Sequence, residues 1–107
     1  MTKLKPCMDA LGIRVVCGEA DAFDGVYAGD LLSRAMSHVE AGNLWITIMN
    51  NVNVIAVASL AEAAAVLLAE GVSLTPDALA AAEEKGICVL SAEQPVYDLC
   101  AGIAGLV

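Results

Sequence analysis

The chain of 107 residues predicts a single α/β domain, spanning residues 1–107, whose mostly parallel sheet of four to five strands has helices on both faces. Three observations predict this fold class. Short aliphatic runs alternate with segments that carry helix-capping residues, as strands and helices do in α/β proteins. The central runs are apolar at every position, which is typical of parallel strands covered on both faces. The length is that of one domain.

The N-terminal part of the chain predicts one helix, one strand and one loop. Apolar residues recur on one face over residues 1–12, with Thr2 as the expected cap and Gly12 as the expected stop. Residues 13–17 form a β-branched run that predicts the first strand. Residues 19–25 are acidic and carry a glycine, so we expect a loop there.

A helix and a second strand are expected next. The pair at 26–27 is too short to assign from the sequence. Asp30 is a good N-cap for a helix that continues to Val39, and Gly42 is a suitable terminator. Residues 44–49 are rich in strand-forming residues and predict the second strand, with buried faces.

The following segment is locally ambiguous. Residues 54–57 are β-branched enough for a strand, whereas the alanines after them favour a helix. We favour a helix that is capped by Asn50 or Asn51 and that ends near Glu62.

Two strands and two helices complete the prediction. Residues 65–69 predict a third buried strand. Thr75, followed by proline, is a strong helix start, and Lys85 is favourably placed at the negative end of that helix. A fourth strand is expected at 87–91 and a last helix at 95–104.

The charge balance argues against two classes of partner. Thirteen acidic residues against five basic ones give a net charge of -8. Nucleic acid and anionic membranes are therefore not expected to bind. The uncharged stretch 41–61 contains four asparagines, so we do not expect a membrane helix. No secretory signal is expected, and the four cysteines are too sparse for a disulfide framework, so we predict reduced thiols in the cytoplasm.

Hydrophobic residues make up 59% of the chain, which is an unusually large share. A domain of this size buries only about two thirds of its unfolded surface. A lone monomer would therefore expose much apolar area, and we expect a homodimer, with its contacts in the alanine-rich helices and the tail 99–107.

The sequence carries no recognisable catalytic, cofactor or metal-binding pattern. Neither the phosphate loop of nucleotide hydrolases nor the glycine pattern of dinucleotide-binding folds occurs. His38 has no nucleophile at a recognisable spacing, so it is expected to end its helix. We therefore expect no cofactor, no metal and no catalytic residue.

Polar residues follow the predicted strands and are the best candidates for a ligand site. In open α/β sheets, ligands bind outside the carboxyl ends of the strands. The alternative is that the asparagine and serine side chains only cap the next helices. The candidate residues are Asp30, Ser33, Asn50, Asn51, Asn53, Glu70, Gly71, Ser91 and Tyr97.

Three stretches together resemble the DRTGG domain family. They are VYAGDLLSRAM (26–36), LWITIMNNVNVIAVASLAEAAAVLLAEG (44–71) and AAEEKGICVLSAEQPVYDLC (81–100). The resemblance implies a homodimeric regulatory or ligand-sensing domain, with a fold like that of MurF and of the N-terminal domain of HPr kinase/phosphorylase. It also implies that residues 53–61 are helical.

The string that gives the family its name is absent from this chain. Its polar turn after the second strand corresponds best to 50–53, and its glycine pair corresponds to Glu70 and Gly71. The catalytic half of HPr kinase carries the phosphate loop, which this chain lacks, so the resemblance does not imply kinase activity.

Three functional hypotheses follow. The first is a non-catalytic cytoplasmic homodimer that binds a small molecule, such as a nucleotide, or a partner protein near its strand ends. The second is a small enzyme or phosphotransfer accessory in which His38 or Asp30 carries the chemistry. The third is an assembly subunit of a redox complex, because the similar short members accompany hydrogenase components, with Cys17 or Cys88 facing the partner.

Overall fold

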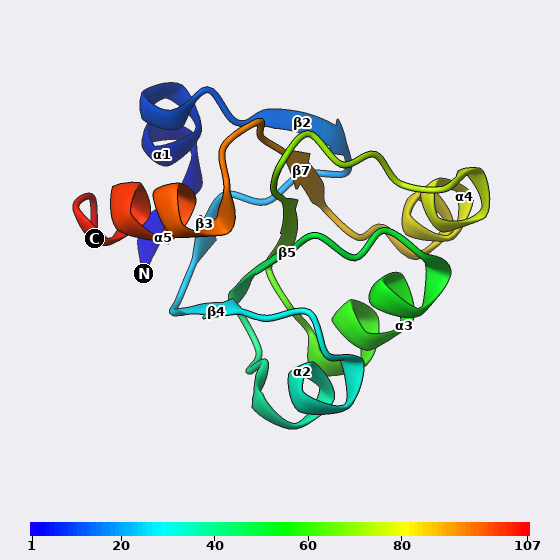
Figure 1. Ribbon diagram of the computed structural model, residues 1–107. Coiled ribbons are helices and arrows are strands. Elements are labelled where there is room, and N and C mark those ends of the chain that lie inside the picture. Colours follow the sequence, from blue (N-terminus) through cyan, green and yellow to red (C-terminus); the bar gives the residue numbers. More distant parts are fainter.

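The computed structural model describes residues 1–107 and is organised around a five-stranded sheet in the order β2-β7-β6-β5-β4 (Figure 1). The four strands from β7 to β4 are parallel, and β2 at one border runs antiparallel to β7. A separate two-stranded ribbon pairs β1 with β3. The strands are β1 Thr2–Lys3, β2 Arg14–Cys17, β3 Ala22–Phe23, β4 Val26–Ala28, β5 Leu44–Thr47, β6 Ala65–Leu68 and β7 Val89–Ser91.

Helices cover both faces of the sheet, as the sequence predicts. One face carries α1 and α5, which come from opposite ends of the chain, and the other carries α2, α3 and α4 (Figure 1). The two termini lie near each other beside α5. The helices are α1 Leu4–Leu11, α2 Leu32–His38, α3 Val52–Ala61, α4 Pro76–Lys85 and α5 Val96–Ala104.

The central strands separate two cores. Every residue of β5 and β6 is buried. Because side chains alternate along a strand, Leu44 and Ile46 enter the core under α1 and α5, whereas Trp45 enters the core under α2, α3 and α4. The indole nitrogen of Trp45 donates a hydrogen bond of 3.0 Å to the carbonyl of Gly29, so its one polar atom is satisfied. The prediction of apolar strands covered on both faces is confirmed.

The ambiguous segment is a helix. Asn51 caps α3 by accepting a hydrogen bond of 3.1 Å from the backbone N–H of Asn53. Glu62 ends the helix in the left-handed conformation, with φ of 58°. Since α3 packs between α2 and α4 over the sheet, tertiary burial supports the helix where local propensity was divided.

The helix after the third strand begins as predicted. The hydroxyl of Thr75 accepts from the backbone N–H of Ala78 at 3.4 Å, and Pro76 occupies the first helical position. Gly86 ends the helix with φ of 69°. A cap of this kind contributes about 1 kcal/mol to helix stability. The predicted last helix is also confirmed, as α5.

Three local predictions were wrong. Thr2 does not cap the first helix, because it pairs with Phe23 in the β1–β3 ribbon and the helix begins at Leu4. Part of the expected loop 19–25 is strand β3. Asp30 is not the cap of α2, whose cap position is Leu31 without a side-chain bond, because the Asp30 carboxylate bonds to the end of β5 instead.

The surface has an ordinary extent. The chain exposes 5508 Å², close to the ~5,600 Å² that a compact monomer of this mass exposes. Large apolar side chains that are at least one third exposed include Val15, Val16, Val26, Leu31, Met36, Leu60, Tyr97, Leu106 and Val107. None of the helices is both long and apolar enough to cross a membrane.

Candidate functional site

The carboxyl ends of the four parallel strands lie side by side at one end of the sheet, which we name the carboxyl edge. It is formed by the segments that follow these strands, residues 29–31, 48–51, 69–75 and 92–95. Because β2 is antiparallel and pairs Arg14 with Ser91, the start of β2 also lies at the carboxyl edge. Five segments far apart in sequence therefore come together there.

Asp30 links the ends of two neighbouring strands. Its carboxylate accepts hydrogen bonds from the hydroxyl of Thr47 at 2.8 Å and from the backbone N–H of Ile48 at 3.1 Å. The Thr47 hydroxyl in turn accepts from the N–H of Met49 at 3.2 Å. The predicted site residue Asp30 thus lies at the carboxyl edge, but its acceptor atom is already used to fix the segment after β5.

The asparagine cluster has mostly structural partners. Asn50 donates through its side-chain amide to the carbonyl of Ser73 at 2.8 Å and accepts at its own carbonyl from the N–H of Thr75 at 3.1 Å. Asn51 caps α3, while the side chain of Asn53 is exposed on the first turn of that helix. The capping alternative therefore describes Asn51, and Asn50 joins the segments after β5 and β6.

Glu70 and Gly71 form a tight turn at the centre of the edge. Both have a left-handed backbone, with φ of 59° and 69°. Their amides donate to the carbonyls of Gln94 at 2.9 Å and Ala92 at 2.8 Å, so these two N–H groups are not free for an anion. The left-handed backbone explains the glycine at 71, because other L-residues are strained at that φ.

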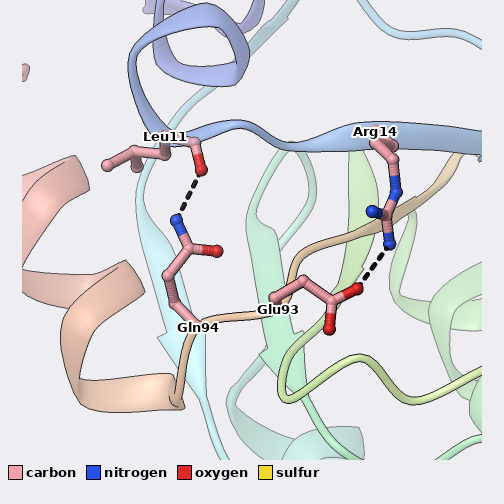
Figure 2. Close-up of polar contacts among 4 residues, drawn as sticks. All are labelled: Leu11, Arg14, Glu93 and Gln94. Atoms are coloured by element: carbon pink, nitrogen blue, oxygen red, sulfur yellow. Dashed lines mark hydrogen bonds and ion pairs between the residues drawn. The ribbon is translucent and has the colours of Figure 1, made fainter.

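The one basic side chain in these connections is Arg14, and it is paired. Its guanidinium contacts the Glu93 carboxylate at 3.0 Å (Figure 2). Both side chains are well exposed, at 61% and 72%, so the pair contributes little to stability. Beside it, the side-chain amide of Gln94 donates to the carbonyl of Leu11 at the end of α1 (Figure 2).

Sequence reasoning missed Arg14, Glu93 and Gln94. It assigned residues 13–17 to a strand without a direction, and only an antiparallel β2 brings the start of that strand to the carboxyl ends of the others. The available signal was the isolated arginine directly before an apolar run.

The remaining predicted residues lie around this border at different depths. Ser91 ends β7 and is buried. Tyr97 lies in the first turn of α5 and is 79% exposed. Ser33 is exposed on α2, where its carbonyl accepts from the hydroxyl of Ser37 at 3.0 Å. The structure therefore brings Asp30, Asn50 and the 70–71 turn to one edge, with Ser33, Asn53 and Tyr97 on the helices that start there.

The two surface hollows lie elsewhere. The larger, of about 530 Å³, is the β4 groove: it runs beside β4 and α5 and is lined mainly by hydrophobic residues, among them Phe23, Val26, Ile103 and Val107. The smaller, of about 310 Å³, lies between α1 and residues 19–21. None of the nine predicted site residues lines either hollow.

The candidate catalytic histidine is engaged with its own helix. Nδ1 of His38 lies 2.9 Å from the carbonyl of Arg34, and its ring stacks on Tyr27 with 6.1 Å between ring centres. Asp30, the other residue considered for chemistry, lies in the hydrogen-bond network described above. These contacts bring no Ser or Cys nucleophile to either side chain.

The four cysteines are unpaired thiols. Burial raises the pKa of Cys88 to about 11, with the neighbouring Cys17 and Glu19 adding to the effect. Burial also raises the pKa values of Cys7, Cys17 and Cys100. Such thiols are poor nucleophiles at neutral pH because the thiolate is scarce. No group of three or more His, Cys, Asp or Glu residues is placed to hold a metal ion.

The fold and the arrangement of its strand ends define a small α/β domain built on a mostly parallel five-stranded sheet. Residues 7–105 match the model of the DRTGG domain, and the chain belongs to the DRTGG domain family. The resemblance noted in the sequence is therefore confirmed. None of the curated proteins matches the sequence.

A solved structure shares this fold. It is the crystal structure of the CBS and DRTGG domains of the regulatory region of Clostridium perfringens pyrophosphatase, complexed with the activator diadenosine tetraphosphate. The TM-score is 0.76 over 95% of this chain, with 12% sequence identity, so the likeness shows the fold alone. This chain spans about half of that chain, 46% of its length.

Proposed function

We propose that this chain is a non-catalytic regulatory domain that works as a homodimer in the cytoplasm and senses a small anionic ligand of the nucleotide class. The observation that carries the ligand proposal is the convergence of five connections at the carboxyl edge, with Arg14 as their only basic residue. Open parallel sheets bind ligands at this border. The free thiols are compatible with a reducing compartment.

The Arg14–Glu93 pair is suited to exchange with a ligand. A guanidinium offers a planar set of donors that fits a phosphate. Its present partner is a highly exposed carboxylate, and exposed ion pairs are worth only about 0–1 kcal/mol. A phosphate group could replace Glu93 at Arg14 at small cost. Tyr97, exposed at the start of α5, offers an aromatic face for a base.

The related regulatory region supports the choice of ligand class. That protein was crystallised with diadenosine tetraphosphate, a nucleotide that carries several phosphates. At 12% identity the likeness shows the fold alone, so the ligand class proposed for this chain rests on its own carboxyl edge.

The test is a thermal-shift and calorimetric titration of the full chain with diadenosine tetraphosphate, ATP, AMP and inorganic phosphate. A ligand at 100 times its dissociation constant stabilises the folded state by about 2.7 kcal/mol. We expect one nucleotide to raise the midpoint, and Arg14→Gln to weaken its binding about tenfold or more, because a charge-assisted contact is lost.

The matched control is Lys85→Gln, which removes an exposed base at the last turn of α4. It should leave the nucleotide response unchanged. An equal loss in both variants would mean nonspecific attraction to positive charge. A flat response of the wild-type chain to the whole panel would contradict the ligand proposal and favour the alternative of an assembly subunit, whose partner in a redox complex would then be sought by co-purification.

A further inference from the structure

We infer that the homodimer forms through the free border of β4, with a second copy of this chain pairing antiparallel across a two-fold axis at Tyr27. This inference rests on the homodimer part of the proposed function and names its surface.

The inner side of β4 is fully paired. The N–H of Gly29 donates to the carbonyl of Ile46 at 3.1 Å, and the carbonyl of Gly25 accepts from the N–H of Leu44 at 3.0 Å. Because the main-chain groups of alternate residues point to the same side of a parallel strand, the N–H and C=O of Tyr27 also point toward β5. The N–H and C=O groups of Val26 and Ala28 therefore point outward, where the sheet has no further strand.

This outward border fits a copy of itself. When two β4 strands lie antiparallel with Tyr27 opposite Tyr27, Val26 of one copy is opposite Ala28 of the other. Directly opposite residues whose main-chain groups face each other exchange two hydrogen bonds, so the two such pairs form four. The glycines at 25 and 29 flank the strand and leave no side chain in the way.

The β4 groove is continuous with the same border. The side chains of Val26 and Ala28 line it, together with α5 and the C-terminal residue Val107. In the antiparallel pair these side chains from both copies lie on one face of the joined sheet, so the two apolar grooves become a single trough. Leu106 and Val107, which are 44% and 70% exposed, provide apolar side chains to fill it.

The two edge strands of the sheet, β2 and β4, differ in how they are protected against pairing with another chain. β2 carries the charged Arg14 and an irregularity between Val15 and Cys17, both of which discourage pairing at an edge. β4 has no charge, proline or bulge within its three residues, and Val26 is 40% exposed. A stable interface buries about 800 Å² per partner. Three paired residues of β4 bury less than this, so Leu106 and Val107 are also expected to lie in the interface.

The net charge of the chain distinguishes the binding of a second copy from the binding of a foreign partner, because the two respond differently to salt. Two chains of net charge -8 repel each other, and salt screens that repulsion. The self-association of the chain should therefore become tighter as ionic strength rises. The binding of a basic peptide to the outer edge of β4 should instead become weaker. The occupant is a second copy, because the outward main-chain groups of β4 match those of an antiparallel β4 across a two-fold axis.

The experiment is light scattering and sedimentation of the full chain over a concentration series, with two matched variants. Val26→Lys places a charge at the β4 border, and Val15→Lys places one at the β2 border, where Val15 is 55% exposed. We expect a wild-type particle of twice the 10.9 kDa chain mass and at least about tenfold weaker association for Val26→Lys alone. Circular dichroism and the melting temperature of each dilute variant verify that it folds.

Amide exchange gives a second readout. The amides of Val26 and Ala28 should exchange fast in dilute protein and slowly at high concentration, because only the partner bonds them. A wild-type monomer at every concentration would overturn the dimer itself. A dimer that survives Val26→Lys but not Val15→Lys would keep the dimer and place it at β2. Neither result affects the nucleotide titration, so the two proposals fail separately.

Discussion

The two faces of the sheet are covered in different ways. Three helices in sequence order, α2, α3 and α4, cover one face, and each follows directly from a parallel strand. Two helices from opposite ends of the chain, α1 and α5, cover the other. Two helices leave part of that face uncovered, and the β4 groove lies there, whereas no hollow of similar size opens on the three-helix face.

The two faces also differ in the sequence separation of the contacts that hold their helices on the sheet. The three-helix face is assembled from local units, since a strand and the helix after it pack together within a few tens of residues. The two-helix face depends on contacts between chain ends, such as the Gln94 bond to Leu11 across 83 residues. The side chain of Leu11 also packs on Gly102, where an added Cβ would lie 2.6 Å from it. The face that needs distant contacts is thus the one that carries the β4 groove.

The largest expected effect compares two buried isoleucines, one on each face. Ile55 on α3 is fully buried under the three-helix face, and Ile103 on α5 is buried but also lines the β4 groove. Ile55→Ala should cost about 4 kcal/mol of unfolding free energy and Ile103→Ala about 2 kcal/mol, because side chains beside an open groove relax into the space more easily. Urea unfolding of both variants at low protein concentration measures the difference. Equal costs would show that the β4 groove does not ease relaxation around Ile103.

Alkaline pH should destabilise the two-helix face through Cys88. Burial raises the pKa of this thiol to about 11, above its value in the unfolded chain. The neutral thiol is therefore favoured in the folded state, so the contribution is complete below about pH 8.5 and is lost as pH rises from about 8.5 to about 11, for a total of about 3 kcal/mol. Unfolding of the wild type and Cys88→Ala between these pH values should show a flatter decline in the variant. Parallel declines would show that Cys88 is not responsible.

The same contrast explains part of what the sequence could predict. On the three-helix face, Asn51, Thr75 and Gly86 are local signals that end or begin helices, and the structure confirms α3 and α4 close to the predicted bounds. On the two-helix face, Thr2 looked like a cap because nothing nearby in sequence reveals its pairing with Phe23. Strand pairing across twenty residues is a tertiary event, and a local pattern does not contain it.

The carboxyl edge shows the same limit. The sequence placed polar residues after each parallel strand, and Asp30, Asn50 and the 70–71 turn do lie at that border. It did not show that Asp30 and Asn50 bond to neighbouring segments, since those partners lie 17 to 25 residues away. It also missed Arg14, because the direction of β2 depends on pairing with the last strand of the chain.

A smaller effect is expected at the bond that ties the ends of the chain together. Gln94→Ala removes the donor to the Leu11 carbonyl and should cost about 1 kcal/mol. Asn50→Ala, the control near the three-helix face, removes one exposed side-chain bond to Ser73 and should cost about 0.5 kcal/mol. Only Gln94→Ala should accelerate amide exchange throughout α1. Faster exchange in α1 for both variants would mean that α1 does not depend on this particular bond.

The smallest effect is expected at the start of α4. The Asp77 carboxylate accepts hydrogen bonds from the Thr75 hydroxyl at 2.6 Å and from the Ala78 N–H at 3.0 Å. The Thr75 bond, with backbone bonds at Ala78 and Asp77 adding to it, holds the pKa of Asp77 below its ordinary value. A carboxyl whose pKa is lower in the folded state stabilises fully above its unfolded value of about 3.9 and loses that contribution as pH falls through the folded value.

Asp77→Asn should therefore flatten the acid side of the stability profile, and Thr75→Val should flatten it in the same way because it removes the first donor. Urea unfolding from about pH 6 to about pH 3 measures the slopes. The change should be small, since the group is exposed and solvent screens it. An unchanged slope in both variants would show that the start of α4 is held by Pro76 and by packing on the sheet rather than by this carboxylate, and would make the three-helix face less dependent on local capping than its sequence indicates.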